Sequence, residues 1–127
     1  MIAVVFASGR PDRLYTGLSL LVSAAAEGEA ARGLVTFGAL AAFLDGNLHA
    51  RALEAPELSD DGREIFARTL VELRATADEL PDCRIWACAA AVETTGTARA
   101  DVDAALDGVL STPRFLRAIG DARLVVV

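Results

Sequence analysis

The chain has 127 residues, enough for one domain with a buried core and too few for two. Its formal net charge of −6 argues against a nucleic-acid partner, and the complete lack of lysine excludes Schiff-base chemistry and a Walker-type phosphate loop. Hydrophobic residues make up 54% of the sequence, a share that predicts apolar surface covered in a homo-oligomer.

The first third of the chain predicts an alternation of strands and helices. The apolar run Ile2–Ala7 is rich in β-branched residues and is typical of a strand buried on both faces. Helical spacing then begins at Pro11 and stops before Gly28. A second strand is expected at 33–37, followed at once by a short apolar helix at 38–44.

Residues 45–60 are the least regular part of the sequence. A glycine and a proline interrupt any periodicity, so we expect an excursion loop or a lid. Asp61 and Glu64 resemble a capping box, which predicts the start of a helix that ends near Leu80.

The remaining sequence continues the alternation. Cys83–Ala87 predicts a third buried strand, and Ala89–Thr95 predicts a helix with Gly96 as its C-terminal cap. Three more elements are expected: a helix at 101–110, a helix at 112–119 and a strand at 122–127. The whole pattern predicts a single α/β domain over residues 1–127, a three-layer α/β/α fold with a mainly parallel five-stranded sheet.

Candidate chemistry concentrates where the predicted strands end. In open parallel sheets, ligands bind beyond the carboxyl ends of the strands, and Cys88 lies there at the start of a helix, where N–H groups and the helix dipole stabilise a thiolate. Arg10 is expected to add positive charge. Cys88 is therefore the candidate catalytic residue, and the candidate ligand-binding residues are Ser8, Gly9, Arg10, Phe37, Gly38 and Ala89.

Other chemically active side chains have simpler interpretations. Cysteine is often a buried packing residue, which is the favoured interpretation for Cys83 and remains an alternative for Cys88. His49 is interpreted as a solvated loop residue, because no neighbouring carboxylate in the sequence supports a general base. The aspartates 101, 103 and 107 are interpreted as a solvated helix face, so neither a metal site nor a cofactor is expected.

A cytoplasmic location is expected. The first residues, MIAVVFASGRPDR, lack the basic start and the uninterrupted apolar run of a signal peptide, and no apolar stretch is long enough to span a bilayer. Both cysteines should then be free thiols, since Cys83 and Cys88 on one extended strand lie too far apart for a disulfide.

The order of these features resembles the DsrE/DsrF-like family of small sulfur-relay proteins. The resemblance spans nearly the whole chain and rests on the segments ASGRPDRLYTGLSLLVSAAAEG, LVTFGALAAFL, RIWACAAAVETTG and PRFLRAIGDARLVVV, each in its place along the sequence. It implies a three-layer α/β/α fold, assembly as a dimer, trimer or hexamer, and a cysteine at the end of the third strand that carries sulfur as a persulfide. By position this cysteine is Cys88, and the implied partners are sulfur donor and acceptor proteins.

Two other functions stay open at this point. The first is a non-catalytic binding or scaffold protein, oligomeric, that uses the same cleft for a small ligand. The second is peroxide reduction by Cys88, which is the weaker interpretation because the sequence offers no resolving cysteine at a suitable spacing.

Overall fold

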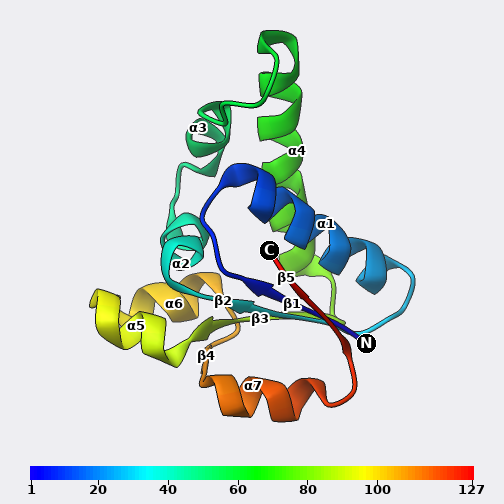
Figure 1. Cartoon of the computed structure of the whole chain (residues 1–127), viewed down its shortest axis with the longest axis vertical. Helices are drawn as coiled ribbons and strands as arrows, with labels where there is room; N and C mark the ends of the chain where they lie inside the picture. The colour runs from blue at the N-terminus through cyan, green and yellow to red at the C-terminus, as the bar shows by residue number, and fades with distance from the viewer.

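The computed structural model describes all 127 residues and centres on a five-stranded, all-parallel sheet (Figure 1). The strand order is β4-β3-β2-β1-β5, so the chain adds strands towards one edge and then crosses back to place the last strand beside the first. The strands are β1 (Ile2–Phe6), β2 (Ala31–Val35), β3 (Cys83–Cys88), β4 (Val109–Leu110) and β5 (Arg123–Val126).

Seven helices connect and cover these strands. They are α1 (Pro11–Ala26), α2 (Phe37–Leu44), α3 (Leu48–Leu53), α4 (Asp60–Glu79), α5 (Ala89–Thr95), α6 (Arg99–Ala105) and α7 (Thr112–Ile119). Figure 1 shows α1 and α4 on one face of the sheet and α7 on the other, while α5 and α6 flank the end where β3 leads into β4. The predicted three-layer α/β/α fold is therefore confirmed.

The α1 face carries most of the core. Alternate residues of β1 point to this side, and Phe6 packs edge-on against Phe43 of α2 with the ring centroids 5.0 Å apart. Gly17 lets α1 approach closely, because a Cβ at this position would lie 2.3 Å from the Phe6 ring. In all, 28 buried residues form one hydrophobic cluster.

The opposite face is covered by α7 alone. Phe115 of this helix is buried and meets Trp86 of β3 at a centroid distance of 6.3 Å, with the rings nearly perpendicular. Ile119, one helical turn further on, is also buried, whereas Leu116 is half exposed. One eight-residue helix leaves part of this face uncovered, above all along β5.

The second strand begins and ends two residues earlier than predicted. The backbone N–H of Thr36 and its Oγ1 hydroxyl both donate to the carbonyl oxygen of Phe6, at 3.0 and 2.8 Å, and the extended conformation ends at the next residue, where Phe37 has a φ of 32°. Thr36 then acts as the N-cap residue of α2, which starts at Phe37.

The segment 45–60 is not the loop or lid that its irregular sequence suggests. It contains the short helix α3, which Asn47 caps by accepting a hydrogen bond from the Ala50 N–H through its side-chain oxygen. The predicted capping box of the next helix is also wrong. Ser59 caps α4 by accepting from the Gly62 N–H at 3.2 Å, one residue before the helix begins.

The predicted helix over 101–110 ends early, since α6 stops at Ala105 and β4 follows. Gly108, with a φ of 122°, turns the chain, and its carbonyl accepts from the Ala87 N–H at 2.9 Å. Asp107 anchors the turn because its Oδ2 accepts from the Ile85 N–H at 2.7 Å. Tertiary hydrogen bonds to β3 thus override the helical pattern.

Other boundaries agree closely with the sequence. The helix α5 spans the predicted residues and ends at Gly96 in a left-handed conformation with a φ of 66°, and α7 spans the predicted residues as well. None of the helices combines the length and the apolar character needed to cross a membrane.

Candidate functional site

Three loops meet where the central strands end. The register pairs Phe6 with Val35 and Val35 with Ala87, so β1, β2 and β3 finish at the same level. The loops that follow therefore share one edge of the sheet, as expected for a parallel sheet. The first is the loop 8–10 after β1, the second is 36–38, where Thr36 leads into the first turn of α2, and the third is the direct junction of β3 with α5 at residues 88–89.

The first two loops touch through their backbones. A Cβ built on Gly9 would lie 2.5 Å from the carbonyl oxygen of Gly38, far inside normal contact distance. Only glycine at position 9 allows this approach without a backbone shift. The candidates Gly9 and Gly38 thus hold two strand ends together.

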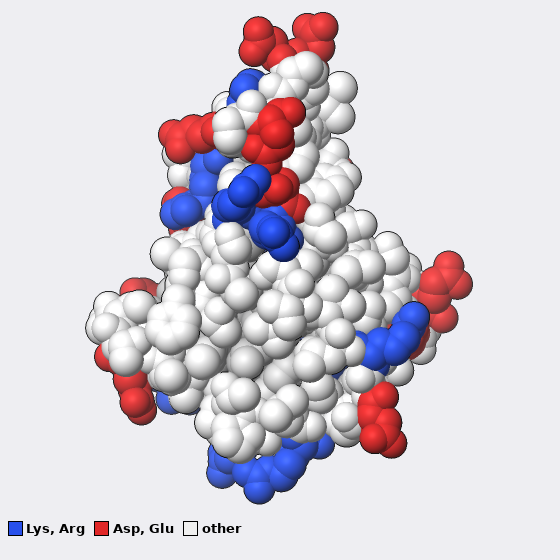
Figure 2. Space-filling model, viewed as in Figure 1, with Lys and Arg blue, Asp and Glu red and all other residues white.

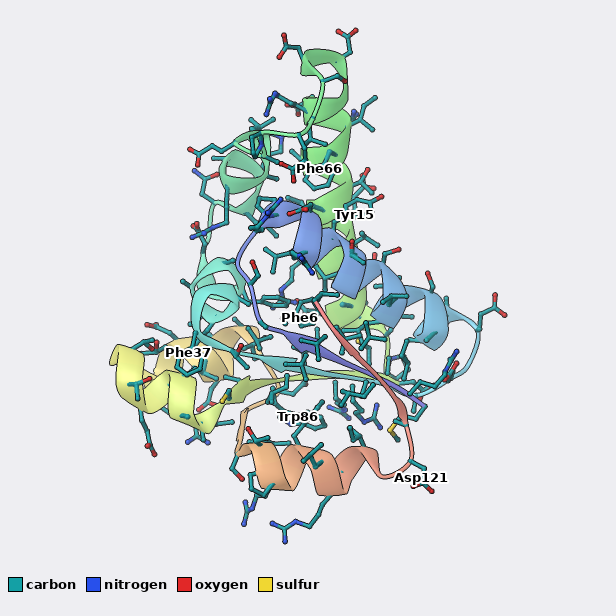
Figure 3. The ribbon with its side chains drawn as sticks, in the orientation of Figure 1. Phe6, Tyr15, Phe37, Phe66, Trp86 and Asp121 are labelled. Atoms are coloured by element: carbon teal, nitrogen blue, oxygen red, sulfur yellow. The ribbon has the colours of Figure 1, made fainter.

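Phe37 stands out in the second loop. Its φ of 32° makes it the only residue other than glycine with a positive φ, a conformation that costs an L-residue free energy. Its side chain is 51% exposed, and Figure 3 shows it between α2 and α5. A strained, exposed aromatic residue therefore marks this edge of the sheet.

Cys88 ends β3 and serves as the N-cap residue of α5. Its thiol is free and only 5% exposed, and it belongs to the hydrophobic core. Its strand neighbour is Leu110 of β4, and its side chain makes no capping hydrogen bond to α5. Its sequence neighbours are Ala87, which is buried, and Ala89, which begins α5.

Arg10 is paired with two carboxylates, so its positive charge is not free to stabilise a thiolate at Cys88. Its guanidinium group is bound to Asp12 and Glu57, each at 3.1 Å, and its side chain is largely exposed. These hydrogen bonds raise the pKa of Arg10 above its ordinary value, the bond to Asp12 contributing most. Ser8 also serves this loop, since its Oγ accepts from the Arg10 N–H at 3.2 Å.

Cys83 lies at the opposite end of β3 and is also buried. The odd spacing between the two cysteines places them on opposite faces of the sheet. Burial raises the pKa of the Cys83 thiol to about 11, with a further contribution from Asp107, so at neutral pH it remains protonated. This environment supports the packing interpretation.

His49 has a partner that the sequence does not reveal. Its Nε2 lies 2.8 Å from Oε1 of Glu64, which joins α3 to α4 across fifteen residues. The irregular segment between the two residues hides this pairing, because no single helical period relates them. The pair lies on an exposed surface of the α3–α4 unit, away from the three loops at the sheet edge.

The aspartates 101, 103 and 107 do not form one helix face. Asp107 lies outside α6 and bonds the backbone of β3, as described above, while Asp103 pairs with Arg99 within the helix at 3.5 Å. No cluster of three histidine, cysteine or acidic residues is close enough to hold a metal ion.

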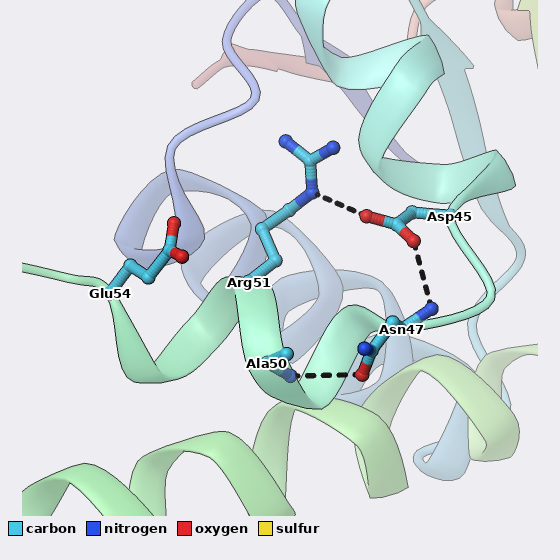
Figure 4. Close-up of a pocket in the computed structure, with 5 residues that line it drawn as sticks. All are labelled: Asp45, Asn47, Ala50, Arg51 and Glu54. Atoms are coloured by element: carbon cyan, nitrogen blue, oxygen red, sulfur yellow. Dashed lines mark hydrogen bonds and ion pairs between the residues drawn. The ribbon is translucent and has the colours of Figure 1, made fainter.

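The one pocket of the molecule lies in the 45–60 segment, not beside Cys88. It is an open hollow of about 410 Å³ between the end of α2 and α3, shown in Figure 4. Asp45 accepts from the Asn47 N–H at 2.8 Å and from Arg51 at 3.2 Å, and these bonds, the first above all, lower the pKa of the Asp45 carboxyl. The polar groups in the hollow therefore largely satisfy one another.

Comparison with family models finds no match for this chain, and no curated protein matches its sequence.

Proposed function

We propose that this protein is a sulfur-relay protein in which Cys88 accepts sulfane sulfur as a persulfide and passes it on. The observation that carries the proposal is the position of Cys88, at the carboxyl end of a central parallel strand and at the first turn of α5. The resemblance to the DsrE/DsrF-like family supports it, with a homo-oligomer in the reducing cytoplasm as the implied setting.

The proposed chemistry consists of two thiol exchanges. The Cys88 thiolate attacks the terminal sulfur of a donor persulfide, forming a new S–S bond while the S–S bond of the donor breaks and the donor leaves as a thiolate. An acceptor thiolate then attacks the terminal sulfur held on Cys88. The Cys88 thiolate leaves, so no external oxidant or reductant is consumed.

Burial sets the main requirement for these steps. With 5% of Cys88 exposed, the thiol must become accessible through local opening at the start of α5 or at the neighbouring loop that carries Phe37. The buried, apolar surroundings suit a persulfide, since they exclude water that would compete for the reactive sulfur.

The decisive experiment is intact-protein and peptide mass spectrometry after incubation of the full chain with glutathione persulfide. We expect an adduct of one sulfur atom on the peptide containing Cys88. The adduct should be absent from Cys88→Ala and retained in Cys83→Ala, which removes the other buried cysteine of the same strand. Equal sulfur uptake by wild type and Cys88→Ala would overturn the proposal.

A second candidate function is a non-catalytic binding or scaffold protein. It is favoured by the burial of Cys88, by the absence of a capping hydrogen bond to its side chain and by the two carboxylates that occupy Arg10. Reaction with a small thiol reagent separates the two functions. A relay cysteine reacts in the folded protein, whereas a packing cysteine reacts only at the rate of global unfolding.

A further inference from the structure

The edge strand β5 presents unpaired backbone groups to the outside. The N–H groups of Arg123 and Val127 donate to β1, at Met1 and Val5, with distances of 3.2 and 2.9 Å. Because successive residues of a strand point their backbone groups to opposite sides, the N–H and C=O groups of Leu124 and Val126 face away from β1. No other strand lies on that side, since β5 is the last in the sheet order.

The side chains along this edge are apolar and exposed. Leu124 is 48% exposed and Val126 is 62% exposed, and both point to the side of the sheet that carries α7. The half-exposed Leu116 of α7 belongs to the same side. Figure 2, which views the molecule with β5 towards the reader, shows charged side chains at the top, bottom and flanks and a broad uncharged area between them.

The other edge of the sheet is protected in ways that β5 is not. The edge strand β4 has only two residues, and it is preceded by Asp107, which pairs with Arg84 at 3.5 Å. Short edges and nearby charges discourage further strand pairing. The strand β5 has twice that length, no proline and no bulge, and its only charged side chain, Arg123, is paired with Glu29 at 2.8 Å.

From these observations we infer that β5 is a docking edge for a second copy of the same chain. The two copies of β5 run antiparallel about a twofold axis at Val125, which extends the sheet across both subunits. A second copy is the occupant because the strand complements itself in hydrogen bonding, in side chains and in charge. The inference does not depend on the chemistry of Cys88.

The register follows from the free backbone groups. With the axis at Val125, Leu124 lies opposite Val126 of the second copy, and each such pair exchanges two N–H to C=O hydrogen bonds. All four outward groups of each strand are then satisfied. The exposed leucine and valine side chains of both copies fall on the same face, where they form one apolar cluster.

Charge does not oppose this arrangement, although each chain has a net charge of −6. The uncharged area in Figure 2 lies in the middle of the face that β5 crosses, and the acidic side chains visible in that view lie at the top and along both flanks. The neutralised Arg123 is the only ionised side chain in the strand itself. Repulsion between the copies is therefore weak at the contact and screened beyond it at physiological salt.

The test compares one substitution at two equally exposed sites. Val126→Lys places an ammonium group in the proposed contact, and Ile65→Lys places one on α4, where Ile65 is 60% exposed and distant in the fold from β5. Sedimentation equilibrium of the full chain should give twice the 13.3 kDa of one chain for wild type and Ile65→Lys. Val126→Lys should give the mass of one chain, or half the wild-type mass if the wild type assembles beyond a dimer.

Two results would overturn the inference by mass alone. One is a wild type that stays monomeric at every concentration, and the other is a Val126→Lys variant, folded by circular dichroism, that keeps the wild-type mass. A monomeric chain that pairs through β5 only with a different polypeptide would assign the edge to another partner and would also overturn it.

Amide exchange then tests strand pairing directly. In the dimer, the Leu124 and Val126 amides should become protected as protein concentration rises, whereas the Arg123 amide is already bonded to β1 in each chain. In Val126→Lys that concentration-dependent protection at position 124 should be lost. A dimer whose Leu124 and Val126 amides exchange as freely as those of a monomer would contradict pairing through β5.

Discussion

The two ends of the sheet are held together by different means. At the carboxyl end, residues 8–10 and 36–38 touch through the backbones of Gly9 and Gly38. Phe37, next to Gly38, has a strained backbone with a positive φ. At the amino end, Glu29 bridges Arg123 at 2.8 Å and the N-terminal amine of Met1 at 3.1 Å, on the surface. Steric fit tolerates little change, whereas exposed ion pairs are weak and exchange readily with water.

The candidate site lies at the end with the tight fit. Loops that position reactive or ligand-binding residues need a fixed geometry. Backbone contacts between the loops fix that geometry even when no ligand is bound. The contrast also separates the two cysteines of β3, because Cys88 ends the strand at the close-packed edge and Cys83 begins it beside the solvated one. Substitutions that probe each end should therefore differ in size.

The largest effect is expected for Gly9→Ala. The added methyl group would meet the carbonyl oxygen of Gly38, so the two loops must separate, and we expect a loss of about 2 kcal/mol in the free energy of unfolding. Gly46→Ala is the matched control, because a Cβ there meets no atom within 4 Å. Urea unfolding of both variants provides the measurement. Equal stability of the two would show that the close approach does not constrain this edge.

A smaller effect on the free energy of unfolding is expected at Phe37, and the comparison to make is between its replacement by glycine and by alanine. In an ordinary helical position alanine is more stable than glycine, but the positive φ of Phe37 reverses that preference. We therefore expect Phe37→Gly to exceed Phe37→Ala in free energy of unfolding by about 1 kcal/mol. Thermal and urea unfolding of the pair measure the difference. A more stable Phe37→Ala would mean that the backbone at this residue carries no strain.

Local patterns were sufficient for much of the fold. The apolar run of β1, the helical spacing of α1 and the glycine after α5 gave elements close to those observed, because each signal lies within a few neighbouring residues. Five strands were expected, but the position of β4 was not predicted, because its two residues carry no periodicity and fall within the helix expected at 101–110. The strand forms where Asp107 and Gly108 bond β3, and those partners lie over twenty residues away.

The place of the candidate site in the fold could be predicted from the sequence, but the contacts of its side chains could not. Cys88 was expected at a strand end and lies there, since strand and helix patterns on its two sides define the junction. Arg10 is held by Asp12, two residues away, and also by Glu57, which is 47 residues away in a segment whose helix the sequence did not reveal. The positive φ of Phe37 is likewise imposed by tertiary packing, for which its own residue type gives no signal.

The smallest effect is expected for Glu29→Gln at the amino end. Hydrogen bonds from Arg123 and from the N-terminal amine hold the pKa of Glu29 below its ordinary value, so its contribution to stability is present above the unfolded-state pKa of about 4.3 and is lost as pH falls through the lower folded-state pKa. Urea unfolding should therefore show a slight loss for Glu29→Gln at neutral pH that shrinks with added salt and vanishes at acid pH. Glu27→Gln, an exposed neighbour without an ion pair, should lose nothing at either pH. A loss for Glu29→Gln as large as that for Gly9→Ala would remove the distinction between the two ends, because an exposed ion pair would then stabilise the fold as strongly as close packing.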